Sequence, residues 1–184
     1  MPTHIALIRG INVSGQKLIR MKELSAMLSD LGYDHVQTYI QSGNIVFQSE
    51  TSDEAQLANQ ISSQIGNVFG FEVIVFVRSV NYLETIIGRS PFKNRDDFEL
   101  KKCYYVFLSK EPEAHLIREL QEKNYENERF IIENQCLFLY CIKGAGQAKL
   151  TNNEIEKRLG VQATSRNYNT VQKLVAIGKA HLEM

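Results

Sequence analysis

Short apolar runs alternate with segments whose apolar residues recur every three or four positions, a pattern that predicts strands interleaved with helices. In the first half, the runs at 4–9, 35–40, 45–48 and 72–77 predict strands. The stripes at 24–31 and 51–70 predict helices, the second opened by a capping box of Thr51 and Glu54. A short helix is expected to start at Ser79, which gives the order strand, helix, strand, strand, helix, strand, helix.

The second half repeats this order of elements without repeating the residues. Strands are expected at 103–108, 128–133, 136–142 and 161–165. Pro112 opens one helix, Thr151 and Glu154 form a capping box for another, and Asn169 caps a last one. Gly88, Pro91 and a charged mixture interrupt the pattern, so we expect subdomains at 1–88 and 103–184 joined by a linker at 89–102.

These elements predict an α+β fold of two tandem ferredoxin-like (βαββαβ) subdomains with extra C-terminal helices. Such a subdomain has the strand order fourth, first, third, second, with antiparallel neighbours. A single mixed sheet and a doubly wound parallel fold are the alternatives. Hairpins at 41–44 and 134–135 argue against a wholly parallel sheet, because parallel neighbours need a long crossover.

The composition argues against several classes of protein. The 184 residues are 43% apolar, and no apolar run approaches the roughly 20 residues of a membrane helix, so no membrane partner is expected. The first residues lead straight into a strand without a cleavable signal. Three cysteines in no metal-binding pattern indicate a reduced, cytoplasmic protein rather than a disulfide scaffold, and no metal or cofactor is predicted.

Charge is balanced overall, at 21 basic and 21 acidic residues, but it is unevenly distributed. Residues 1–22 and 157–182 contain no acid, whereas 111–133 contain seven. Such asymmetry can attract an anionic partner to a neutral protein, although small proteins also differ between faces by chance.

The expected topology brings polar segments together at sheet ends. In the first half, 9–12 and 41–44 follow strands that point the same way; in the second half, 143–149 and 164–169 do so. Glycines let backbone N–H groups approach a ligand, guanidinium groups fit phosphate or carboxylate, and a helix start attracts anions. The candidate ligand-binding residues are Arg9, Asn12, Lys22, Gln41, Ser42, Asn44, Lys149, Arg166, Asn167, Asn169 and Thr170. Taken singly, each residue can also have a purely structural role. Arg9 can end a strand, Asn44 can form hydrogen bonds within its turn, and Asn167 or Asn169 can cap a helix.

Four motifs carry a family resemblance. They are Arg9-Gly10-Ile11-Asn12-Val13-x-Gly15, Met21-Lys22-x-Leu24, the run from Thr38 to Phe47, and the run from Ala163 to Val171. In these motifs the chain resembles, over essentially its whole length, a bacterial family filed as domain of unknown function 1697. Tyr168 stands where that family more often has Trp. The resemblance implies a cytoplasmic α+β protein and brings no established activity.

Motifs of known chemistry are incomplete. Gly10 to Lys17 resembles a phosphate loop, but Gln16 separates the lysine from the second glycine and Leu18 lacks a hydroxyl. Ser42 lacks the context of an activated nucleophile. Tyr104 and Tyr105 resemble a stacking platform for RNA, but core packing explains them more simply. No catalytic residue is therefore predicted, and whether the protein is an enzyme stays open.

Three hypotheses follow. The first is binding of a phosphorylated or other anionic small ligand at the candidate residues. The second is nucleic-acid binding through the basic N- and C-terminal stretches, which would weaken steeply as salt rises. The third is that the motifs are structural and hold the two subdomains together through buried polar networks.

Overall fold

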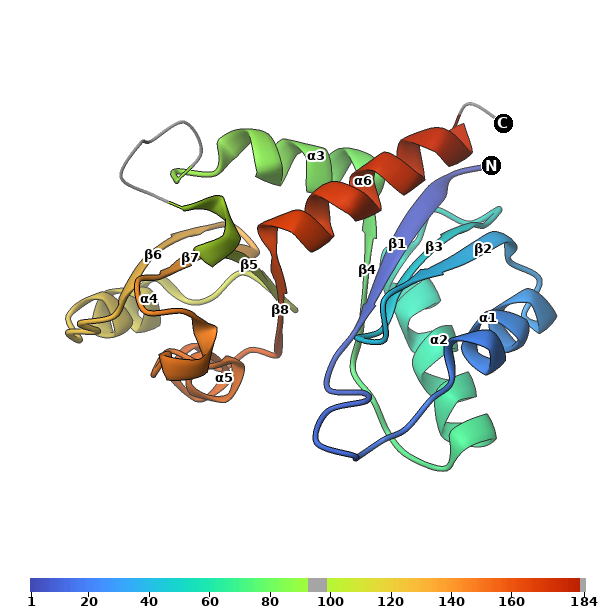
Figure 1. Cartoon of the computed structure of the whole chain (residues 1–184), viewed down its shortest axis with the longest axis horizontal. Helices are drawn as coiled ribbons and strands as arrows, with labels where there is room; N and C mark the ends of the chain where they lie inside the picture. Colours follow the sequence, from blue (N-terminus) through green and yellow to red (C-terminus); the bar gives the residue numbers. More distant parts are fainter. Residues whose placement is uncertain (93–98, 183–184) are drawn as a thin grey trace. The chain divides into compact units, whose positions relative to one another are not determined.

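The computed structural model describes residues 1–92 and 99–182, and within them the chain is an α+β protein with two four-stranded antiparallel sheets and six α-helices (Figure 1). The chain divides into two compact units. Unit 1 is Met1–Glu84 with Lys173–Met184, and unit 2 is Thr85–Gln172. Both boundaries fall inside helices, α3 (Val80–Arg89) and α6 (Tyr168–Leu182).

The expected limits of 1–88 and 103–184 for the subdomains stay a prediction, because compactness alone does not show which segments fold independently. Residues 93–98 of the expected linker lie outside the described residues. The linker's last residues, Leu100–Lys102, form the 3-10 helix η1.

Unit 1 has its strands in the order β2-β3-β1-β4, which is the order expected from the sequence. Its elements are β1 (Thr3–Ile8), α1 (Met21–Asp30), β2 (Asp34–Tyr39), β3 (Asn44–Gln48), α2 (Glu54–Phe69) and β4 (Val75–Ser79), with parts of α3 and α6.

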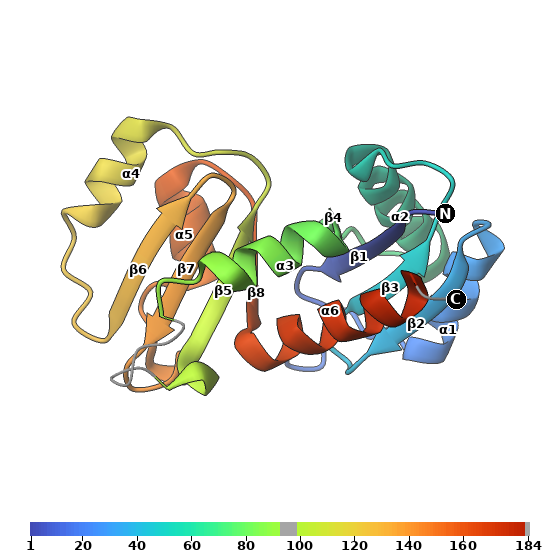
Figure 2. The ribbon, with the colours of Figure 1, turned by 90° about the horizontal axis from the view of Figure 1, so that it is seen from above.

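Helices α1 and α2 cover one face of this sheet (Figure 1). Leu24 and Leu28 of α1 and Ile61 of α2 pack there against Ile45 and Phe47, and all five side chains are buried. The last turns of α6 meet the other face in front of β2 and β3 (Figure 2), where Gln48 Nε2 donates to the His181 carbonyl oxygen at 2.9 Å. Unit 1 therefore has helices packed against both faces of its sheet, although β2 stays partly exposed.

Unit 2 has the strand order β6-β7-β5-β8. Its elements are η1, β5 (Cys103–Leu108), α4 (Ala114–Gln121), β6 (Glu128–Glu133), β7 (Cys136–Cys141), the 3-10 helix η2 (Ala145–Gln147), α5 (Asn152–Leu159) and β8 (Ala163–Asn167), with parts of α3 and α6. Val106, Leu137 and Ile155 belong to its buried core. Tyr105 is 1% exposed and stacks with Tyr168, so it packs in the protein interior.

The two units share one pattern of main-chain hydrogen bonds where the first strand of each ends. In unit 1, Ile8 N–H donates to Gly43 O and Arg9 N–H donates to Ile74 O, at 2.8 and 2.9 Å. In unit 2, the equivalent pairs are Leu108 to Gln135 and Ser109 to Gln162, at 2.9 and 3.0 Å. We call these bonds the shared frame. Residues 9–20 separate β1 from α1, whereas only 109–113 separate β5 from α4, so unit 1 carries a longer insertion on the same frame.

Helix caps differ from the sequence prediction at two places. Helix α2 begins at Glu54 and is capped by Asp53, whose carboxylate accepts from Ala55 and Gln56 N–H, so the predicted capping box at Thr51 and Glu54 was wrong. An aspartate at this position satisfies two N–H groups at once. The predicted capping of the last helix by Asn169 was also wrong, since Asn167 Oδ1 accepts from Thr170 N–H at 2.8 Å.

The last strand was predicted at 161–165 but lies at Ala163–Asn167. Its residues pair with Tyr104 to Leu108 of β5, and these pairs extend the strand through polar residues that a search for apolar runs passes over. The segment 164–169 is therefore mostly strand, not a loop at the sheet end.

Candidate functional site

The insertion of unit 1 follows an unusual backbone path. Gly10, Asn12, Ser14, Gly15 and Lys17 all have positive φ, between 48° and 74°. A positive φ is readily adopted by glycine and costs free energy for most other residues. Lys17 Nζ donates to the Glu72 carbonyl oxygen at 2.6 Å, which ties the tip of the insertion to the chain before β4.

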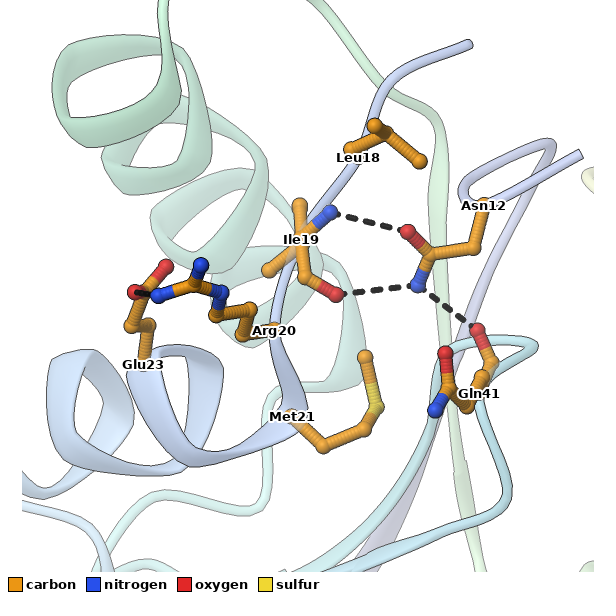
Figure 3. Close-up of a pocket in the computed structure, with 7 residues that line it drawn as sticks. All are labelled: Asn12, Leu18, Ile19, Arg20, Met21, Glu23 and Gln41. Carbon is orange, nitrogen blue, oxygen red and sulfur yellow. Dashed lines mark hydrogen bonds and ion pairs between the residues drawn. The ribbon is translucent and has the colours of Figure 1, made fainter. Parts of the chain in front are cut away.

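Asn12 fixes the base of the insertion with three hydrogen bonds. Its Nδ2 donates to Gln41 O at 2.8 Å and to Ile19 O at 3.0 Å, while its Oδ1 accepts from Ile19 N–H at 2.9 Å (Figure 3). The amide of Asn12 is thereby committed to holding the insertion against the β2–β3 hairpin. Asn12 therefore fixes the position of the insertion relative to the hairpin.

The hairpin itself is tightly built. Asn44 is fully buried and donates to Tyr39 O at 3.1 Å and Ser42 Oγ at 2.9 Å. Gly43 (φ 75°) lies so close to Ile8 and Ile11 that a Cβ would come within 2.8 Å of Ile8 Cβ. Ile40 has φ 48° although it is β-branched, and its side chain is 50% exposed. Residues of this kind are strained in the left-handed region, and such strain is often kept at functional sites.

A pocket of about 470 Å³ lies where the insertion, the hairpin and the start of α1 meet. Its lining is Asn12, Leu18, Ile19, Arg20, Met21, Glu23 and Gln41. Arg20 and Glu23 point toward each other on one side of Ile19 and Met21, and Asn12 and Gln41 lie on the other side (Figure 3). The pocket therefore offers charge at one end, hydrogen bonding at the other and apolar surface between them.

Two polar groups of the lining are available to a ligand. The Gln41 side-chain amide makes no hydrogen bond within the described part of the chain. Arg20 meets Glu23 with one N–O distance of 3.5 Å, and their side chains are 86% and 53% exposed. Arg20 is also the N-cap of α1 but makes no side-chain capping bond there, so N–H groups of the first turn stay open to solvent or an anion. The ionisable side chains of the lining are those of Arg20 and Glu23.

The remaining candidate residues of unit 1 lie outside this lining. Lys22 is exposed on the first turn of α1, and Arg9 is half-buried just after β1. Ser42 is exposed, but its hydroxyl accepts the bond from Asn44. Of the candidates predicted for unit 1, Asn12 and Gln41 are the two that line the pocket. The sequence analysis missed Leu18 to Met21 and Glu23; the spacing of Arg20 and Glu23 across a helix start was an available signal.

The candidates of unit 2 divide between buried and exposed positions. Arg166 is 8% exposed in β8, and its Nη1 donates to Thr164 Oγ1 at 2.9 Å and Ser165 O at 2.8 Å. Burial lowers the pKa of its guanidinium to about 10. Thr170 is buried and bonded to Asn167, whereas Asn169 is exposed.

Lys149 has an exposed side chain, but its main-chain N–H donates to the buried carboxylate of Glu128. Leu150 N–H donates to the same oxygen at 3.0 Å. Glu128 thus fixes the loop that carries Lys149. In residues 1–92 and 99–182, no group of three His, Cys, Asp or Glu side chains is placed to hold a metal ion. Among the helices described, none has both the length and the apolar character needed to cross a membrane.

Comparison with known proteins bears on the fold and the family. Residues 1–138 match the model of a family described as protein of unknown function (DUF1697). The conserved bacterial protein SP0830 from Streptococcus pneumoniae has a similar solved structure, with a TM-score of 0.69 and 22% sequence identity over 96% of this chain and 98% of that one. At this identity the likeness supports the fold alone. A search of curated proteins found no match.

Proposed function

The chain belongs to the DUF1697 family of proteins of unknown function, and we propose a function from the geometry of unit 1. The proposal is that unit 1 binds a small organic ligand with an anionic group in the pocket beside Asn12 and Gln41. Gln41 and Arg20 contact the ligand, and Asn12 positions the pocket walls.

The observation that carries this proposal is the insertion on the shared frame. Unit 2 joins β5 to α4 through 109–113 and keeps the same main-chain bonds, so the longer connection is not required for the sheet. In unit 1, residues of that connection form most of a pocket of about 470 Å³, a volume within the usual range for small-ligand sites. Loops that exceed what a scaffold needs are the usual carriers of binding function.

Backbone strain and charge support the same site. Ile40, next to Gln41, keeps a left-handed conformation that costs about 1–3 kcal/mol and persists only where the surrounding structure imposes it. Arg20 presents an exposed guanidinium next to the open N–H groups of α1, and both favour a negative group.

Two of the candidates, Asn44 and Asn167, already form hydrogen bonds inside their own unit, and these bonds leave untested the hypothesis that the motifs hold the two subdomains together. Asn44 is fully buried in the hairpin, and Asn167 caps α6. We expect Asn44→Ala and Asn167→Ala to lower the melting temperature without changing ligand affinity at the pocket. Ligand contacts by Arg9, Lys22, Ser42, Lys149, Arg166, Asn169 and Thr170 stay a prediction.

The test uses methionine methyl groups as reporters. The chain has four methionines; Met21 lines the pocket, and Met27 is 4% exposed in the core of unit 1. Protein labelled with ¹³C at the methionine methyl groups is titrated with a panel of small carboxylates and phosphate esters, and Met21→Leu assigns the reporter signal. At least one probe is expected to shift the Met21 signal and leave that of Met27 in place.

Arg20→Gln is expected to weaken that binding severalfold, whereas Arg118→Gln, which removes an exposed arginine of α4, leaves it unchanged. If no member of the panel moves the Met21 signal at millimolar concentration, the proposal is overturned. Equal affinity in Arg20→Gln and in the parent protein removes Arg20 from the site.

The proposal includes two further expectations, one about the fold of each unit and one about the location of the protein in the cell. Each unit is best described as ferredoxin-like, which is supported by its element order and its strand order. A cytoplasmic location is supported by three buried cysteines that form no disulfide, Cys103, Cys136 and Cys141.

A further inference from the structure

The pocket contains an opposite pair of charges. Arg20 and Glu23 both line it, and their nearest nitrogen and oxygen atoms are 3.5 Å apart. Both side chains are mostly exposed, so the pair is weak and easily rearranged. The pair is therefore well placed to be replaced by contacts with a ligand.

The charge of the ligand decides what that replacement costs. A ligand with only an anionic group would take Arg20 from Glu23 and bring a second negative charge beside the carboxylate. A ligand with only a cationic group would take Glu23 from Arg20 and bring a second positive charge beside the guanidinium group. A ligand with both charges gives each side chain a new partner, so one weak ion pair becomes two and no like charges meet.

The surface between the charged pair and Gln41 is apolar. Leu18 is 67% exposed, Met21 is half-buried, and Figure 3 shows Met21 between the charged end and the amide end of the lining. A ligand that consists only of charged groups would leave this surface in water. An apolar body lying on Leu18 and Met21 would remove it from water, which is favourable.

From the shared lining of Arg20, Glu23 and Met21, we propose that the pocket takes a small zwitterion, a carboxylate and an ammonium group joined to an apolar body, as in an amino acid with an aromatic or aliphatic side chain. The carboxylate pairs with Arg20, the ammonium group pairs with Glu23, and the apolar body lies on Met21 and Leu18. This inference rests on the proposed function and names its ligand class.

Three probes with the same phenyl group separate the charges. They are L-phenylalanine, 3-phenylpropanoate and 2-phenylethylammonium, each titrated against the Met21 methyl signal with Met27 as the internal control. Phenylalanine is expected to bind about two- to fivefold more tightly than either singly charged probe, the range that one exposed ion pair contributes. The full chain is used throughout.

Two charge-removing variants test the roles of the pair. Glu23→Gln is expected to abolish the preference for phenylalanine over 3-phenylpropanoate. Arg20→Gln is expected to abolish the preference for phenylalanine over 2-phenylethylammonium. Glu119→Gln, which removes an exposed carboxylate of α4, is the matched control and keeps both preferences.

The outcomes separate this inference from the proposed function. If 3-phenylpropanoate binds as tightly as phenylalanine and Glu23→Gln changes neither affinity, the zwitterion is wrong and the anion-binding pocket stands. The phenyl probes could leave the Met21 signal in place while a member of the panel of carboxylates and phosphate esters moves it. In that case the zwitterion proposal is wrong and the proposed anion-binding function stands. If neither set moves it, both proposals fail.

Discussion

The side-chain amide of Asn12 joins two strained segments, because its Nδ2 donates both to Gln41 O, at 2.8 Å, and to Ile19 O, at 3.0 Å. Gln41 follows Ile40, whose φ is positive, and Asn12 itself has φ 55°. Asparagine tolerates this conformation better than most residues. One residue type thus meets a backbone requirement and a hydrogen-bonding requirement at the same position.

Asn12→Ala is expected to lower the free energy of unfolding by about 2–3 kcal/mol, because a partly buried N–H and two carbonyl groups lose their partner. Urea denaturation measures this loss, and faster amide exchange at Ile19 locates it. Ser14→Ala is the matched control: Ser14 has φ 50° and is exposed, so the change should cost well under about 1 kcal/mol. Equal effects of the two variants would contradict the role assigned to Asn12.

Gly43→Ala is expected to destabilise the protein by about 2–4 kcal/mol. The new Cβ combines a positive φ with contacts of 2.8 Å to Ile8 Cβ and 2.9 Å to Ile11 Cδ1, and overpacking adds to backbone strain. Gly15→Ala isolates the backbone effect, since Gly15 has φ 74° and nothing lies within 4 Å of its added Cβ. Chemical denaturation of both variants should place Gly43→Ala clearly below Gly15→Ala, and the reverse order would disprove the close packing of the hairpin.

Two helical glycines should respond to alanine in opposite directions. At Gly178 in α6, a Cβ would lie 2.5 Å from Val80 Cγ2, so Gly178→Ala should destabilise the protein by about 1–3 kcal/mol. At Gly66 in α2, nothing lies within 4 Å, and alanine should stabilise the helix by about 0.5–1 kcal/mol. Melting temperatures compare the two, and a stabilising Gly178→Ala would show that α6 and α3 are less closely packed at this point.

Stability should fall as the solution becomes acidic. Burial lowers the pKa of His181, with His35 nearby adding to the effect, and burial also lowers the pKa of His4. A lowered pKa means that the fold favours the neutral ring. The contribution is therefore complete above the ordinary pKa of 6.5 and is lost as pH falls below it toward the folded-state values.

Free energies of unfolding measured above pH 6.5 and at successively lower pH values test this expectation, because the loss begins below the unfolded-state pKa of these groups. His181→Gln should flatten the decline, while His115→Gln, which removes an exposed histidine of α4, should leave it unchanged. A stability that does not change over this range would contradict the assignment.

Much of the fold was predictable, because apolar periodicity reflects burial. The strand Cys103–Leu108 was predicted at its observed limits, and the strand order of each sheet is the one expected from the predicted βαββαβ order of elements. Gly70 and Gly160 end α2 and α5 in the left-handed conformation, which is a common end for a helix. The N-cap of α2 was predicted two residues too early, because Asp53 and Thr51 are both good caps and only the folded backbone selects between them.

The site was less predictable, because a polar residue type does not reveal its partner. Asn12, Asn44 and Asn167 were chosen as ligand contacts, yet each one satisfies main-chain groups of its own unit. Arg166 lies in a strand that apolar runs do not reveal. The pocket includes Leu18 and Met21, which attract no attention in a search for polar motifs. Pocket walls depend on the path of the insertion, and that path depends on a series of positive φ angles that sequence does not specify.

The shared frame has a consequence for how such a protein can diversify. Because the ends of β1 and β5 are held by main-chain groups, these bonds do not themselves require particular side chains, although Gly43 has no room for a Cβ. Natural selection can therefore lengthen, shorten or rewrite the connection that follows either strand while the sheet beneath it stays intact. The connection after each strand can thus change in length and sequence without changing the strand end that it follows, so specificity and foldability can evolve on separate parts of the same polypeptide.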